Sequence, residues 1–120
     1  MRTYPFENLG VWQKSRVLVG KIYKISAKFP NEEKFGLTSQ IRRAGVSVCS
    51  NLAEGSGRIS GKEQARFTEI AYSSLLEVLN QLFIAADLHY MKMEELNELR
   101  PLFGQLTLGL NNLRKAQLKK

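Results

Sequence analysis

The 120 residues are enough for one domain, and a composition of 43% hydrophobic and 24% charged residues excludes an intrinsically disordered chain. The single cysteine excludes an internal disulfide, and no apolar run approaches the ~20 residues that a membrane-spanning helix needs. We therefore expect one soluble domain over residues 1–120, in the cytoplasm, with no secretory signal after Met1 and no membrane contact.

The net charge of +7 is unevenly distributed along the chain. Residues 1–62 hold eleven basic and four acidic side chains, residues 63–113 hold three and seven, and residues 114–120 add four basic ones. A segregated basic surface attracts RNA or DNA, although it can equally serve only to keep a protein soluble.

Apolar residues recur at helical spacing in the first half of the chain, which predicts two helices. The first helix is expected over residues 11–29, ended by Pro30. The second is expected over residues 37–54, with Thr38 or Ser39 as its N-cap and with many small residues that permit close helix packing. The glycine-rich run of residues 55–61 should end it, with glycine in the left-handed conformation.

The second half predicts two longer helices. The third is expected over residues 62–89, with Ser60 as N-cap and Glu63 as its capping-box partner. Its apolar seam, which includes Ile70, is widened by Leu76 and neighbouring side chains, so that a second side is available for another subunit. The fourth is expected over residues 93–118, where Pro101 should cause a kink or a late start.

Four amphipathic helices joined by short connections favour an all-α fold, an antiparallel up-down-up-down four-helix bundle. No alternation typical of β-strands persists long enough to compete.

The residue types that carry catalysis are scarce in this sequence. His89 is the only histidine and Cys49 the only thiol, so we expect no metal site, no cofactor and no histidine-activated nucleophile. The glycine-rich run lacks the spacing of a phosphate-binding P-loop. We predict that the protein is not an enzyme.

One polar line does stand out on the second helix. Its members are three or four residues apart, and they are Gln40, Arg43, Ser47, Asn51 and Glu54. One interpretation is a hydrogen-bond network that fixes helix register or forms a subunit interface, since buried charges need partners. The other is an anion or nucleic-acid contact through Arg42, Arg43 and Arg58.

The same region carries a family resemblance. Matching segments include Phe6-x-x-Leu9-x-Val11-Trp12-Gln13 and Glu33-x-Phe35-Gly36-Leu37, and the most distinctive stretch is Gln40-Ile41-Arg42-Arg43-Ala44, Val46-Ser47, Ser50-Asn51 and Ala53-Glu54-Gly55. In these segments the sequence resembles the bacterial four-helix bundle proteins known as the 23S rRNA intervening-sequence protein family, also labelled S23 ribosomal protein. The resemblance implies a compact antiparallel bundle that assembles as a homopentamer. By analogy of fold with a basic pentameric protein of diversity-generating retroelements, it also implies an RNA or DNA partner.

Two functional hypotheses follow from the sequence and the resemblance. The first is a non-enzymatic, self-associating bundle whose basic surface binds nucleic acid, with Arg42, Arg43, Arg58, Lys62 and Arg66 as contacts and the lysines of the first helix and the C-terminal tail as support. The second is an interaction scaffold whose oligomer docks a partner protein and makes no nucleic-acid contact.

Overall fold

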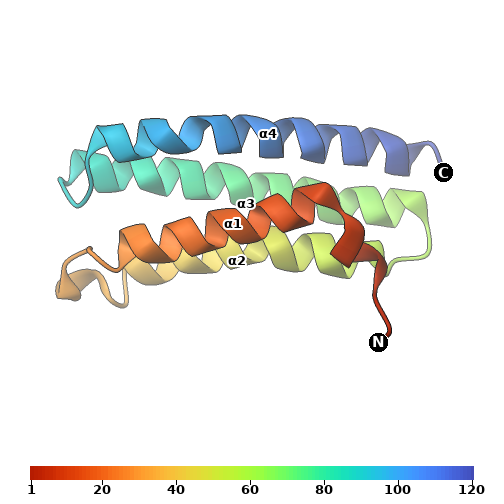
Figure 1. Ribbon diagram of the computed structural model, residues 1–120, viewed down its shortest axis with the longest axis horizontal. Coiled ribbons are helices and arrows are strands. Elements are labelled where there is room, and N and C mark those ends of the chain that lie inside the picture. The colour runs from red at the N-terminus through yellow and green to blue at the C-terminus, as the bar shows by residue number, and fades with distance from the viewer.

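Four long helices form the molecule, and the computed structural model describes all of residues 1–120. The helices are α1 (Gly10–Ser26), α2 (Leu37–Ser56), α3 (Gly61–Asp87) and α4 (Met93–Leu118), with short 3-10 helices at Pro5–Asn8 and Asn31–Glu33. Each helix runs opposite to the one before it in a bundle of 45 × 27 × 24 Å (Figure 1). The predicted all-α antiparallel four-helix bundle is confirmed.

The helices pack around a square. α1 and α3 each pack against α2 and α4, whereas the backbones of the two diagonal pairs stay farther apart. Both termini lie at the same end as the connection between α2 and α3, whereas the α1–α2 and α3–α4 connections lie at the opposite end (Figure 1).

The predicted apolar stripes meet in one core of 20 buried side chains. The largest fully buried ones come from all four helices and are Leu18, Ile22, Ile41, Leu75, Leu82, Leu96, Leu106 and Leu110. Each such side chain contributes roughly 1.5–3 kcal/mol through burial. This core is therefore the main source of stability.

The helix N-termini agree only partly with the sequence prediction. Ser60 caps α3, because its Oγ accepts a hydrogen bond from the Glu63 N–H at 3.1 Å. The predicted Thr38 or Ser39 cap of α2 is wrong, because the helix already begins at Leu37. The Leu37 N–H donates instead to Oε1 of Glu33, at 3.0 Å.

Glycine does not provide left-handed backbone anywhere in the chain, so that part of the prediction for residues 55–61 is wrong. Gly55 still belongs to α2, which ends at Ser56. A Cβ added to Gly55 would lie 2.6 Å from the Cβ of Phe67 on α3. This glycine is therefore needed for close helix packing and not for its backbone angles.

The left-handed position in the fold is occupied by His89, with φ of 62°. The residue follows α3, where the N–H groups of His89 and Tyr90 donate to the carbonyls of Ala86 at 3.0 Å and Ala85 at 2.9 Å. This pair of bonds is a Schellman motif, which satisfies carbonyl groups that a helix end leaves without partners.

Pro101 lies inside α4, which begins at Met93 and continues through it. The predicted late start is therefore wrong. The proline removes the N–H that would bond the Asn97 carbonyl, but both residues are exposed, so that water can take its place.

The outer side of α3 remains uncovered in the single chain. Ile70, which was expected in the seam, is 38% exposed, and Leu76 is 47% exposed. The prediction that Ile70 belongs to the core is thus wrong for the isolated subunit, whereas contact of this side with a second subunit stays a prediction. None of the four helices has the length and apolar character needed to cross a membrane.

Candidate functional site

Only the middle of the predicted polar line forms a network within the chain. Ser47 Oγ lies 2.9 Å from Ser74 Oγ on α3, and Asn51 Nδ2 donates to the Ser47 carbonyl at 2.9 Å and to Ser47 Oγ at 3.0 Å. Ser74 lies on the buried side of α3, three or four residues from the buried Ala71 and Val78. This half-buried network links α2 to α3 and favours one register between them.

The other members of the line point to solvent. Gln40, Arg43 and Glu54 are exposed, and their side chains have no hydrogen-bond or ion-pair partner in the chain. Within one subunit, these three residues therefore take no part in the hydrogen-bond network, which consists of Ser47, Asn51 and Ser74. An interface between subunits stays a prediction.

Arg42 is bound within the bundle. Its Nε donates to the Ser26 Oγ at 2.8 Å, a terminal nitrogen donates to the Tyr23 carbonyl at 3.4 Å, and its guanidinium lies 4.5 Å from the centre of the Tyr23 ring. The positive charge thus lies near the C-terminal end of α1, where the helix dipole favours cations. We assign Arg42 mainly to the packing of α2 against α1.

The remaining basic candidates lie at the far end of α2. The guanidinium of Arg58 is 4.7 Å from the centre of the Phe67 ring, whereas Lys62 and Arg66 are exposed on the first turns of α3. At ~1.5 Å per residue, Arg43 is about 20 Å from this end. The five candidates therefore do not form one compact cluster.

A further basic surface belongs to α1. This helix has four basic and no acidic residues. Lys14, Lys21 and Lys24 are exposed and make no ion pair, whereas Lys28, just beyond the helix, pairs with Glu95 on α4 at 2.8 Å. The Lys28 ammonium holds the pKa of the Glu95 carboxyl below its usual value.

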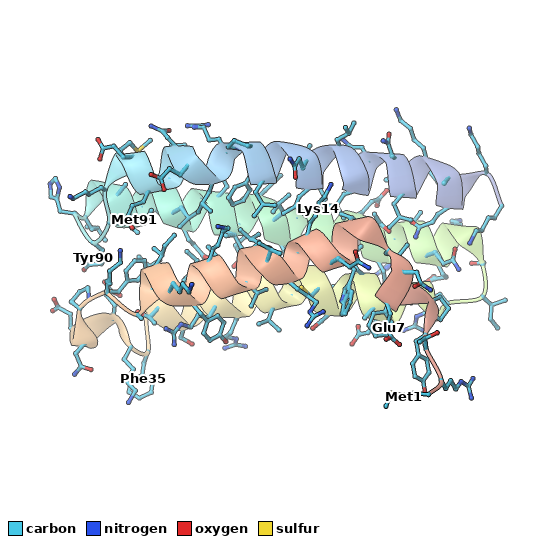
Figure 2. All side chains as sticks on the ribbon, viewed as in Figure 1. Met1, Glu7, Lys14, Phe35, Tyr90 and Met91 are labelled. Carbon is cyan, nitrogen blue, oxygen red and sulfur yellow. The ribbon has the colours of Figure 1, made fainter.

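An open groove of about 750 Å³ runs along the outer side of α2. Its walls combine cations, aromatic rings and small polar side chains, among them Lys34, Arg43, Tyr23, Phe35, Ser50 and Asn51. Figure 2 shows Phe35 projecting from the α1–α2 connection away from the bundle. The exposed polar line and the exposed aromatic ring therefore share one surface.

The whole of this surface falls within a match to a known family. The model of the family described as 23S rRNA-intervening sequence protein matches residues 7–112. The chain belongs to this family. The search of curated proteins gave no match.

Most of α4 lies inside the family match, but the last basic residues lie outside it. Of these, Arg114 pairs with Glu69 at 2.6 Å and Lys120 donates to Gln64 at 2.9 Å, so two of the tail cations already have partners. The match to the 23S rRNA-intervening sequence family thus covers α1, α2, α3 and α4 as far as residue 112.

The reactive residue types lie apart from one another in this family member. No group of three histidine, cysteine or acidic side chains is placed to hold a metal ion. Burial raises the pKa of the Cys49 thiol to about 11, so that the thiol is protonated at neutral pH.

Sequence reasoning missed the role of Glu33. Its carboxylate accepts from the Leu37 N–H at 3.0 Å and from the Tyr90 hydroxyl at 2.9 Å, and these bonds lower its pKa. The signal was a carboxylate four residues before the first residue of a helix, where the free N–H groups favour negative charge.

Proposed function

We propose that the protein is a non-enzymatic, self-associating four-helix bundle whose basic surface binds the phosphates of RNA or DNA. The observation that carries the proposal is the absence of any acidic residue on α1 together with three exposed, unpaired lysines, Lys14, Lys21 and Lys24. Free cations on a rigid helix attract a phosphate backbone without needing base contacts.

The distribution of charge between the two layers of the bundle, α1 with α2 and α3 with α4, also favours the α1 side as the binding surface. Residues 10–56, which contain α1 and α2, hold eight basic and three acidic side chains, whereas residues 61–118 hold six and seven. Because α1 and α2 lie side by side, Arg43 adds its free charge to the same layer (Figure 1).

The test is a salt titration with labelled nucleic acid. We expect binding of a structured RNA and of duplex DNA at ~50 mM salt, weakening steeply as salt increases. Replacing the three α1 lysines by glutamine should reduce the slope of log affinity against log salt by about 2–3, since each phosphate contact contributes ~0.7–0.9.

A control removes positive charge from the opposite layer of the bundle, where Lys92, just before α4, and Arg100 on α4 are exposed and belong to no proposed contact. Their double glutamine variant should retain most of the slope. Equal losses in the two variants would place the interface elsewhere, and no binding to either nucleic acid by the unmodified protein would refute the proposal.

A scaffold that docks a partner protein is the second candidate, and the uncovered apolar side of α3 favours it. Self-association belongs to both candidates, with five subunits implied by the family resemblance. Arg43 is exposed and unpaired in one subunit, as an interface residue would be. Replacing it by alanine should then change the oligomer mass in light scattering, and an unaltered mass would contradict an interfacial role.

A further inference from the structure

Phe35 is the most exposed aromatic ring in the molecule, at 89% of its full surface. It lies at one end of the α2 groove, and its one ring contact is the Lys34 ammonium, 5.5 Å from the ring centre. A phenyl ring left almost wholly in water gives the fold little burial energy. Its place beside a groove therefore points to a ligand.

A second aromatic ring borders the same groove. Tyr23 is 42% exposed, and the Arg42 guanidinium lies 4.5 Å from its ring centre. Because Arg42 also bonds Ser26 at 2.8 Å, this ring is held in a defined orientation. The groove thus offers one fixed and one projecting ring.

The cations of the groove lie next to these rings. Lys34 and Arg43 are exposed and carry no ion pair, whereas the single acidic wall residue is Glu54, near the other end of α2. Rings interleaved with free cations fit a ligand with flat unsaturated groups on an anionic chain. Duplex nucleic acid hides the faces of its bases, and an acidic peptide would leave the rings unused.

We propose that this groove binds single-stranded nucleic acid, with a base stacked on Phe35, a neighbouring base against Tyr23, and phosphates held by Lys34 and Arg43. The inference rests on the proposed nucleic-acid function and names the form of nucleic acid that the α2 surface selects. The hydroxyl and amide groups of Ser50 and Asn51 line the groove between these charges.

The experiment measures fluorescence anisotropy of the full chain with labelled poly(dT) and poly(U) 20-mers and with a 20-base-pair duplex, at ~50 mM salt. Phe35→Ala should weaken single-strand binding about tenfold, since one base–aromatic stack is worth roughly that factor, and should change duplex binding less than twofold. Phe35→Trp should retain the affinity, and its added fluorescence should be quenched by poly(dT).

Ile59→Ala is the matched control, because Ile59 is a fully exposed apolar residue in the connection at the opposite end of α2. It should leave all affinities unchanged. Equal effects of the two alanine variants would overturn the inference, as would unchanged single-strand binding by Phe35→Ala.

Two other occupants give distinct results. Competition by poly-glutamate as strong as that by poly(dT) would indicate that the groove binds an acidic peptide. A smaller oligomer mass for Phe35→Ala would indicate that it binds a second copy of this chain. Either result overturns the inference. If duplex and single strands bind equally well and Phe35→Ala changes neither affinity, this inference is refuted but the proposed function stands. If neither form of nucleic acid binds, the proposed function is refuted as well.

Discussion

At the scale of single residues, Glu33 links the start of α2 to the α3–α4 connection, which is distant from it in sequence. Its carboxylate bonds the first residue of α2 and the hydroxyl of Tyr90, which lies in the α3–α4 connection (Figure 2). The Tyr90 ring in turn packs 5.7 Å from Phe29, the buried residue after α1. One ionised side chain thus holds together both connections at this end of the bundle.

This arrangement predicts a pH dependence. The pKa of Glu33 is lowered in the folded state, chiefly by the Leu37 N–H and then by Tyr90. Its contribution to stability is therefore complete above the unfolded-state pKa near 4.5 and is lost as the pH falls through the lower folded-state value. Glu33→Gln should be less stable than the unmodified protein at pH 7 by urea denaturation, with the difference shrinking below pH 4.5. Parallel pH profiles for the two proteins would contradict this role.

His89 allows a second prediction at the residue scale. A side chain in the left-handed conformation costs roughly 1–2 kcal/mol relative to glycine, which adopts it freely. His89→Gly should therefore raise the free energy of unfolding by about 1 kcal/mol, after the greater flexibility of glycine in the unfolded chain is subtracted. His89→Ala serves as control, because it keeps the strain. A glycine variant no more stable than the alanine variant would contradict the strain assigned to this position.

At the scale of elements, α2 contains two glycines that differ in the space available for a side chain. A Cβ on Gly45 would lie 3.9 Å from the Val19 Cγ2, an ordinary contact, whereas a Cβ on Gly55 would overlap Phe67. The small residues of α2 suggested close packing along the whole helix. The approach that leaves no room for a Cβ occurs at Gly55, against Phe67 of α3, and no sequence pattern specifies this distance.

The two glycines should respond differently to alanine. Gly45→Ala should stabilise the protein by about 1 kcal/mol, because alanine is the better helix former and the methyl group fits. Gly55→Ala should destabilise it by about 1–3 kcal/mol through overpacking against α3. Thermal or urea unfolding of both variants measures the difference. Equal effects of the same sign would show that helix propensity, not space, decides both positions.

The helices themselves were predictable because their stripes are regular. The limits of α4 agree with the sequence, and those of α3 differ by only one or two residues, since Ser60 and the repeating leucines are strong local signals. Signals that depend on other elements were missed. The bond between Glu33 and Tyr90 joins two connections, and the bond between Ser47 and Ser74 joins two helices, so spacing within one segment could not reveal either contact.

At the scale of the whole molecule, the basic residues separate into regions that the sequence could not distinguish. Arg42 and Arg43 are adjacent in the chain, yet one bonds α1 and the other faces solvent. The charge count alone predicted a basic surface. Its division between the α1–α2 layer and the beginning of α3 depends on how the helices pack.

Lys62 and Arg66 test how far that surface extends. They are exposed at the α2–α3 end, about 20 Å along the bundle from Arg43. The double glutamine variant should weaken RNA and duplex DNA binding and lower the salt slope by about 1–2 if a long backbone spans both regions. A short oligonucleotide of about six nucleotides should not sense the change. Loss of binding by the short ligand as well would place the main contact at this end.

The position of the termini has a practical consequence. Both chain ends emerge beside the α2–α3 turn, and the bundle is 45 Å long, with Phe35 at the opposite extremity. An affinity tag, fluorophore or surface tether attached at either end would therefore stand clear of the aromatic ring. Immobilised protein should present that extremity outward, ready for ligands in free solution.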